Sequence, residues 1–203
     1  MGKNRKAGFP RVRKIFALAA VLAGLSFVLY PFISYGQQAK IKDILITRDA
    51  QRVLVYAMLS DCFTREMEAA IRAGVPTMFT FLIDLYEGRP KWFDRKVTRV
   101  TINHTLKYDN VKNIFYVYMD DRQEAGFPDL KSAKRAMAEL NGVPVIAVTS
   151  LQKGGAYYIR MKAKLDKVRL PLHMEYVFFF VSLWDFETDW VEKGLPVNYE
   201  EKS

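Results

Sequence analysis

The side chains that most often carry catalysis are scarce in this chain, which has one cysteine, Cys62, and two histidines, His104 and His173. A Cys62–His104 pair would supply a nucleophile and a base. However, His104 falls between Ile102 and Leu106 on the inward face of a predicted strand. A catalytic base also needs a third group that orients it, and the sequence identifies none. We therefore predict that His104 is a structural residue.

Other catalytic patterns are also missing from the sequence. Paired acids occur at Asp120-Asp121 and at Glu187 with Asp189, but adjacent acids on a strand point to opposite faces. No His or Cys cluster has zinc spacing, no Ser lies in a nucleophile elbow, and no Gly-rich loop follows a strand to bind phosphate. We predict that the protein is not an enzyme and has no catalytic residues, metal site or cofactor.

A basic stripe, Arg160, Lys162 and Lys164, lies on the outward face of the most regular alternating segment, residues 156–167. The alternation predicts a strand whose other face is buried. Three cations in a row could contact anionic phospholipid headgroups or an acidic partner. The alternative is a solvated face that prevents aggregation.

The triplet Trp92-Phe93-Asp94 is the best candidate for a binding site. It follows a charged turn and precedes a strand that begins near Lys96. Because successive side chains on a strand alternate, one aromatic ring should pack on the core and the other should lie on the surface or in a groove. Asp94 is placed to accept backbone N–H bonds and fix the turn. The alternative is that all three residues are purely structural.

Two further aromatic runs, residues 115–118 and 178–180, have two interpretations. They could line a pocket for an acyl chain. Aromatic side chains at strand spacing also commonly fill a core.

The domain reads mainly as strands separated by turns, which favours antiparallel pairing. Thr64 is expected to cap the first of two helices, and Asn141-Gly142 to end the second. We predict an α+β fold, a mainly antiparallel β-sheet or sandwich with two helices, preceded by an N-terminal hydrophobic leader helix. The expected strands are residues 41–47, 52–60, 75–86, 96–107, 112–120, 143–149 and 156–167, the helices are 64–73 and 128–140, and 173–183 is strand or helix.

The leader combines six basic residues and no acid in residues 1–14 with an uncharged run from 15 to 35. Such a run is about long enough for a helix to cross ~30 Å of hydrocarbon, and the basic cluster should stay in the cytoplasm. Residues 1–36 are therefore expected to be a signal peptide or an inner-membrane anchor, with small residues near position 36 favouring cleavage. Residues 37–203 would then form a single β-rich periplasmic domain.

Charge and cysteine content narrow the class of partner. The formal net charge of +9 includes the six leader cations, so residues 37–203 carry only +3. This near balance removes the main argument for nucleic-acid binding. The lone Cys62 cannot form an intrachain disulfide and is expected to be buried.

An ordered set of segments gives the chain a family resemblance. Over about residues 41–190 the chain resembles the exported proteobacterial family known as domain of unknown function 4390, and it departs at Ser182-Leu183-Trp184-Asp185, where members often have Ser-x-Asp-Trp. The resemblance implies a secretory leader and no assigned activity, cofactor or catalytic residue. Some members are encoded near a membrane sensor kinase, which implies an envelope protein or a membrane sensor as a possible partner. The segments are Glu68–Pro76, Asp84, Trp92–Asp94, Leu106–Asp109, Phe127–Leu140, Leu165-Asp166 and Leu170-Pro171.

We therefore predict an uncharacterised exported envelope protein that acts as a non-catalytic protein-interaction module in the periplasm. The alternative is a carrier or sensor of an amphiphilic ligand in an aromatic-lined cavity. A filled core would favour the interaction module, and an apolar cavity open to solvent would favour the carrier.

Overall fold

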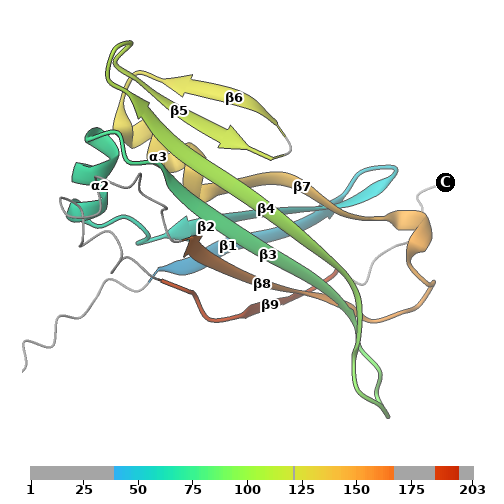
Figure 1. Cartoon of the computed structure of the whole chain (residues 1–203). Coiled ribbons are helices and arrows are strands. Elements are labelled where there is room, and N and C mark those ends of the chain that lie inside the picture. The colour runs from blue at the N-terminus through green and yellow to red at the C-terminus, as the bar shows by residue number, and fades with distance from the viewer. Residues whose placement is uncertain (1–38, 121, 167–185, 197–203) are drawn as a thin grey trace, which may run out of the picture. The chain divides into compact units, whose positions relative to one another are not determined.

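In the computed structural model, which describes residues 39–120, 122–166 and 186–196, two antiparallel sheets and two α-helices form the fold (Figure 1). The predicted α+β class is confirmed, while the expected leader helix lies outside the described residues. The smaller sheet has the order β1-β2-β7 and the larger has the order β6-β5-β4-β3-β8-β9. The elements are β1 (Lys40–Arg48), β2 (Arg52–Ser60), α2 (Arg65–Arg72), β3 (Thr77–Glu87), β4 (Arg95–Asp109), β5 (Ile114–Met119), β6 (Arg122–Phe127), α3 (Leu130–Ala138), β7 (Glu139–Ala147), the 3-10 turn η1 (Val148–Ser150), β8 (Tyr157–Asp166) and β9 (Val191–Gly194).

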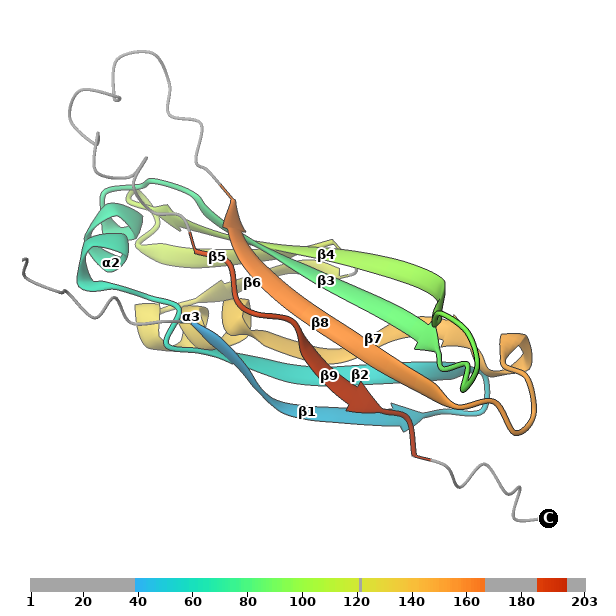
Figure 2. The same ribbon diagram turned by 90° about the horizontal axis from the view of Figure 1, so that it is seen from below.

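One apolar core lies between the two sheets (Figure 2). Period-two alternation places every second side chain of β2, β3 and β8 in this core. On β8 the predicted alternation is confirmed along the whole strand, with the basic stripe on the opposite face. The strand side chains at the centre of the core are Val53, Val55, Phe79, Phe81, Ile83, Leu85, Ile159, Met161 and Ala163.

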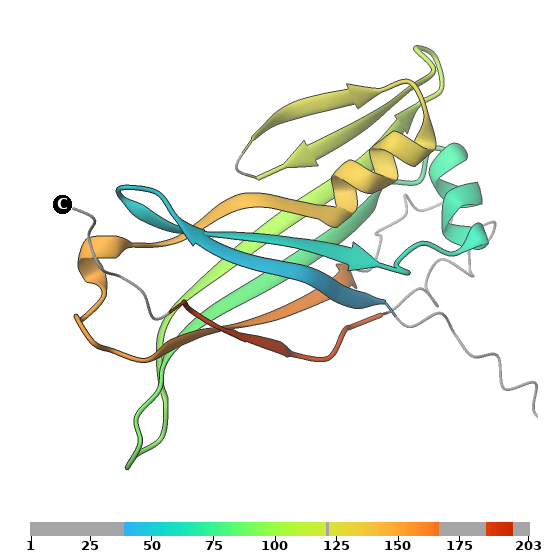
Figure 3. The ribbon, with the colours of Figure 1, turned by 180° about the vertical axis from the view of Figure 1, so that it is seen from behind.

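Both helices begin at side chains that accept a hydrogen bond from the first turn. Thr64 Oγ1 accepts from the N–H of Met67 at 3.2 Å, as predicted, and Asp129 Oδ1 accepts from the N–H of Ser132 at 2.8 Å. These bonds satisfy N–H groups that have no partner within the helix. The helices lie at one end of the larger sheet, where α3 contacts β4, β5, β6 and β2 (Figure 3).

The predicted end of the second helix is wrong. α3 stops at Ala138, and β7 begins at the next residue, Glu139. Glu139 pairs with Met58 on β2, so cross-strand hydrogen bonds replace those that would have continued the helix. Gly142, expected just beyond the helix end, lies within β7 with a φ of +71°, a value that favours glycine.

β7 and β8 are consecutive in the chain but belong to different sheets. These strands do not form a hairpin around the intervening glycine turn, because β7 pairs with β2 and β8 pairs with β3 and β9. Two edge strands, β6 and β9, were not predicted. Both are short and lack a regular apolar alternation, which leaves little signal for a strand. The apolar run at residues 173–183 lies outside the described residues.

The two ends of the long strands carry different elements. The helices and the first residue of β1 lie at one end, and the turn between β3 and β4 lies at the other (Figures 1 and 3). The 11 residues of β3 correspond to about 36 Å at ~3.3 Å per residue. Within the residues described, no helix is long and apolar enough to cross a membrane. The run at 15–35, for which the sequence predicts such a helix, lies outside them.

Candidate functional site

The turn that joins β3 to β4, residues 88–94, is called here the hairpin tip. Glu87 pairs with Arg95 as the last register pair of the two strands. The N–H of Trp92 donates to the carbonyl of Arg89 at 3.1 Å, which closes the turn on itself. The N–H of Gly88 donates to the carbonyl of Ala156 at 2.8 Å, just before β8. Backbone hydrogen bonds therefore fix the base of the tip.

Asp94 braces the hairpin tip from two sides. Its Oδ1 accepts from the N–H of Arg89 at 3.1 Å, as the sequence predicts, and its Oδ2 accepts from the hydroxyl of Tyr158 at 2.7 Å. The Tyr158 bond and then the Arg89 bond lower the pKa of Asp94. The same carboxylate, together with desolvation, raises the pKa of Tyr158 to about 12. Asp94 is therefore ionised at neutral pH and Tyr158 is a neutral donor.

Trp92 and Phe93, the aromatic pair, lie at the end of the hairpin tip and are 75% and 87% exposed. Their rings meet edge to face, with centroids 6.5 Å apart. The prediction that one of them packs on the core is wrong. Both residues lie in the turn rather than on a regular strand, so strand alternation does not direct either side chain inward. Two large apolar rings therefore face solvent side by side.

Two carboxylates of β3 pair with cations in and beside the tip. Because Asp84 and Glu87 are three positions apart on the strand, they lie on opposite faces of it. Glu87 Oε2 is 2.8 Å from Arg95 Nε and 3.4 Å from Arg89 Nη2. Asp84 Oδ1 is 2.6 Å from Arg99 Nε, and its Oδ2 is 2.7 Å from Lys96 Nζ. The side chains of Asp84 and Glu87 are only 2% and 11% exposed, whereas those of the four cations are 40–47% exposed. In these pairs the exposed groups are therefore mainly the cations, on both faces of the hairpin.

The titration of the two carboxylates agrees with this arrangement. Burial raises the pKa of Asp84, but the hydrogen bonds from Arg99 and Lys96 outweigh it and leave the pKa below its usual value. The bond from Arg95 is the main cause that lowers the pKa of Glu87. Sequence reasoning missed the role of Glu87 and named Asp84 only as part of the family pattern. The sequence signal that could have identified Asp84 is that it is the only charged residue of β3 before Glu87.

The basic stripe lies on the face of the larger sheet that also carries Asp84, since Asp84 is the register partner of Arg160. Each cation of the stripe is paired with an acid. Arg160 Nε is 3.0 Å from Glu192 Oε1, and Lys162 Nζ is 2.6 Å from Glu187 Oε1. Lys164 Nζ is 2.9 Å from Asp166 Oδ1 on its own strand. Arg160 and Lys162 also lie over the Trp190 ring, 5.4 and 5.6 Å from its centroid. Binding through the stripe remains a prediction, and these pairs reduce the charge it offers to a partner.

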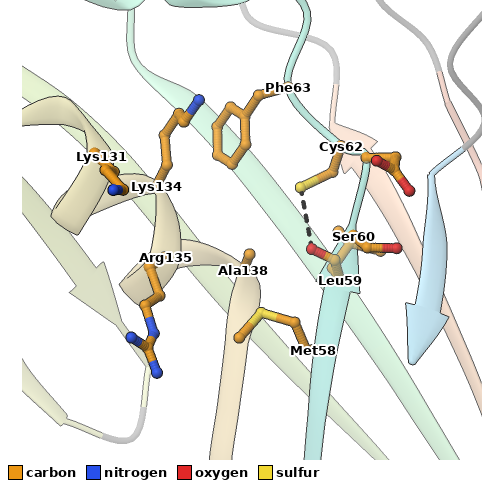
Figure 4. Close-up of a pocket in the computed structure, with 10 residues that line it drawn as sticks. Met58, Leu59, Ser60, Cys62, Phe63, Lys131, Lys134, Arg135 and Ala138 are labelled. Carbon is orange, nitrogen blue, oxygen red and sulfur yellow. Dashed lines mark hydrogen bonds between the residues drawn. The ribbon is translucent and has the colours of Figure 1, made fainter. Parts of the chain in front are cut away.

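A groove of about 370 Å³ lies between α3 and the connection from β2 to α2 (Figure 4). Phe63 stands on one side of it, and the ammonium group of Lys134 lies 5.3 Å from the centre of that ring. Lys134 also pairs with Glu68. The groove thus combines apolar and cationic walls, and its lining residues are Met58, Leu59, Ser60, Asp61, Cys62, Phe63, Lys131, Lys134, Arg135 and Ala138.

Cys62 and His104 engage different backbone carbonyls. The Cys62 thiol is buried, as predicted, and donates to the carbonyl of Leu59 at 3.4 Å. Desolvation raises its pKa to about 12, so the thiol is protonated at neutral pH. His104 is also buried, with Nδ1 2.8 Å from the carbonyl of Met137 and its ring against Phe81. Both environments are typical of structural residues.

Two of the acids considered for catalysis, Asp120 and Glu187, have structural partners. Asp120 Oδ2 accepts from the backbone N–H and the amide of Asn103, at 2.9 and 2.7 Å. Glu187 pairs with Lys162, and Asp121 lies outside the described residues. In the part of the chain that the structure describes, no three His, Cys, Asp or Glu side chains are grouped so that they could hold a metal ion.

The aromatic run at residues 115–118 does not line the groove. Phe115 is buried and stacks on Tyr108 with centroids 4.3 Å apart. Lys112 lies over the ring of Tyr116, and Tyr118 is exposed. The other run, residues 178–180, lies outside the described residues. No residue of the described run therefore contributes to the predicted ligand cavity.

Comparison with known proteins gives one match. A family model described as domain of unknown function (DUF4390) matches residues 36–193. This span includes β1 to β8, the hairpin tip and the basic stripe, and it ends one residue before the last residue of β9. No curated protein and no solved structure matches the chain.

Proposed function

The chain belongs to the family described as domain of unknown function (DUF4390), and from this premise we propose that it is a non-catalytic interaction module of the cell envelope. In this proposal the hairpin tip is the surface that holds the partner. The partner is another envelope component, and the sequence suggests an envelope protein or a membrane sensor. The domain charge of +3, outside the six leader cations, gives no support for a nucleic acid as the partner.

The observation that carries the proposal is the exposure of the aromatic pair on a braced turn. Solvent-exposed Trp and Phe side chains that lie together are uncommon on a surface with no binding role. Trp and Arg are also enriched among the residues that dominate binding energy. The Asp94–Tyr158 bond holds the turn before the partner arrives, which lowers the entropic cost of binding.

Two features support the non-catalytic part of the proposal. A thiol with a pKa of about 12 is a poor nucleophile at neutral pH. The Nδ1 atom of His104 is engaged by the carbonyl of Met137 inside the core, away from solvent. These are the residues that the sequence offers for nucleophilic catalysis, and both are used for packing.

The envelope location rests on the leader sequence. We propose that residues 1–36 direct export and that residues 37–203 lie in the periplasm, either released by cleavage or anchored to the inner membrane. Alkaline phosphatase fused after Ser203 should then be active, because this enzyme needs an oxidising compartment. Activity of only a cytoplasmic reporter at that position would contradict the proposal.

Site-specific photocrosslinking in cells tests the interaction surface. A photoreactive phenylalanine analogue replaces Phe93 in the full chain, and the matched control carries it at Val111, which is 96% exposed in the β4–β5 turn. We expect a defined adduct, with protein or lipid, from position 93 and none from position 111. Absence of any adduct at 93, or the same adduct at both positions, would overturn the proposal.

The groove favours a second candidate function, a carrier of an anionic amphiphile. Its volume of about 370 Å³ lies within the range of small-molecule sites, and Phe63 and Lys131 offer apolar and cationic contacts. Titration with laurate would test it by NMR of methionine methyl groups. Laurate should shift Met58 but not the buried Met161, and Lys131→Glu should weaken the effect. Unchanged Met58 signals would exclude this candidate.

A further inference from the structure

We propose that the hairpin tip binds the surface of anionic phospholipid bilayers, with the aromatic pair inserted at the interface. The cations in and next to the tip would contact the headgroup phosphates, and they are Arg89, Lys91, Arg95 and Lys96. The inference rests on the proposed function, because it names the partner of the same surface.

The shape of the tip suits a soft interface better than a small ligand. The turn projects beyond the neighbouring strands (Figures 1 and 3), and both rings of the aromatic pair point into solvent. A projecting turn of this kind has no concave surface that could enclose a small ligand. Trp is enriched where membrane meets water, because its ring is apolar and its N–H can stay hydrated. A bilayer accepts two adjacent rings without a preformed pocket, which a protein partner would have to supply.

The charge around the tip matches an anionic surface. Each of the two inner carboxylates, Asp84 and Glu87, is shared by two cations, so the cations outnumber the acids that they contact. In each pair the carboxylate is the buried member and the cation is the more exposed one. The third acid, Asp94, stays ionised while it accepts from Tyr158 and the Arg89 N–H. The five cations from Arg89 to Arg99 still outnumber the three acids of the hairpin. Each Lys or Arg near an anionic membrane surface strengthens binding roughly fivefold.

The fixed base of the tip favours insertion of both rings together. The Gly88–Ala156 backbone bond and the Tyr158–Asp94 bond attach the turn to β8 from two sides. The tip therefore enters the interface with little loss of backbone freedom. Its cations lie on the same hairpin and reach the headgroup region in the same approach.

Fluorescence of Trp92 in the full chain tests the proposal directly. The chain has three tryptophans, and Trp184→Phe with Trp190→Phe leaves Trp92 as the only one. The protein is reconstituted in phospholipid nanodiscs, which accommodate its apolar leader. Brominated phosphatidylglycerol, which quenches nearby indoles, is placed first in the disc that holds the leader and then in added vesicles. Both arrangements are needed because β1, the first strand after the leader in the sequence, begins at the end of the domain opposite the tip. We expect quenching of Trp92 in at least one of these arrangements.

Matched variants separate the tip from the rest of the molecule. In a chain with all three tryptophans changed to Phe, Val111→Trp places an equally exposed indole on a different turn. This indole should not be quenched. Lys91 is exposed in the turn, so Lys91→Glu removes a cation without disturbing the core. This variant should weaken vesicle binding at least fivefold. Brominated phosphatidylcholine should quench Trp92 less than the anionic lipid, and added salt should reduce the anionic effect.

Three outcomes would overturn the inference. They are an unquenched Trp92 in both lipid arrangements, equal quenching of the indole at position 111, and equal quenching by neutral and anionic lipids. If lipids fail while Phe93 crosslinks to a protein in cells, the lipid inference is wrong and the proposed interaction module stands. If Trp92 is not quenched and position 93 gives no crosslink, both proposals are wrong.

Discussion

The hydroxyl of Tyr158 on β8 donates a 2.7 Å hydrogen bond to Oδ2 of Asp94 in the turn between β3 and β4. The two residues are 64 positions apart in the sequence, and the bond attaches the turn that carries the aromatic pair to the first residues of β8. A turn held in this way can present Trp92 and Phe93 to a partner without first being ordered.

The Tyr158–Asp94 bond predicts a measurable titration. In the wild type the pKa of Tyr158 is raised to about 12, mainly by Asp94, and Asp94→Asn should lower it toward the usual 10.0. NMR of ¹³C-labelled tyrosine rings would follow this titration. Because the folded pKa lies above the unfolded value, the bond contributes stability that is present below about pH 10 and is lost as the pH rises toward 12.

The matched control for this titration is Asp49→Asn. Asp49 also fixes a turn, since its Oδ1 accepts from the N–H groups of Gln51 and Arg52, but the structure gives it no bond to Tyr158. The control should leave the Tyr158 titration unchanged. A Tyr158 pKa that stays near 12 in Asp94→Asn would show that the Asp94 carboxylate does not raise it, which contradicts the prediction.

Loss of the Asp84 charge should destabilise the fold. Asp84→Asn removes a carboxylate that binds both Arg99 and Lys96 from beneath, and the two cations then face each other without it. We expect a loss of about 2 kcal/mol in the free energy of unfolding, the range for hydrogen bonds to charged groups. Urea unfolding measures it. The exposed Asp43→Asn should change this free energy by less than about 0.5 kcal/mol, and equal effects of the two variants would contradict the prediction.

Acid should weaken the wild type through the same residue. The pKa of Asp84 is lower in the folded chain than the usual 3.8, so its contribution to stability is complete above about pH 4. This contribution is lost as the pH falls through the lower folded value. Urea midpoints between about pH 6 and pH 3 should therefore fall more steeply for the wild type than for Asp84→Asn. Parallel curves would mean that Asp84 does not titrate differently on folding.

The aromatic pair should matter little for stability. Because both rings are exposed, changing Trp92 and Phe93 together to Ala should alter the free energy of unfolding by less than about 0.5 kcal/mol. Phe81→Ala, in the core, should cost about 3–5 kcal/mol. Thermal unfolding measures both effects. A strongly destabilised double variant would indicate that the rings pack on the domain in solution, and loss of function in a stable one would mark them as a binding surface.

The thiol of Cys62 should be inert in the folded protein. Its burial and its pKa of about 12 predict no alkylation by iodoacetamide at pH 8 until the chain unfolds. Val111→Cys in a Cys62→Ser background should react at once, because position 111 is exposed. Cys62→Ser itself should cost about 1 kcal/mol, since Ser can still donate to the Leu59 carbonyl. Rapid native labelling of Cys62 would contradict the buried assignment.

Local sequence signals predicted the features that depend on neighbouring residues. The alternation of residues 156–167 identified the buried and exposed faces of β8, and Thr64 marked the start of α2 through its own side-chain bond. The hairpin of β1 with β2 also follows from a polar turn between two apolar runs. Periodicity, caps and turn residues act over a few positions, so one sequence suffices to read them.

The tertiary structure alone decided the features that depend on distant pairing. The pairing of Glu139 with Met58 on β2 ends α3 earlier than its glycine signal suggests. The tip shows the same principle, since side chains alternate only while the backbone stays extended, and the chain leaves the strand after Glu87 and turns. Both rings of the aromatic pair were therefore free to face solvent. These carboxylate contacts depend equally on register, because only cross-strand pairing brings Asp84 against Arg99 and Tyr158 close to Asp94.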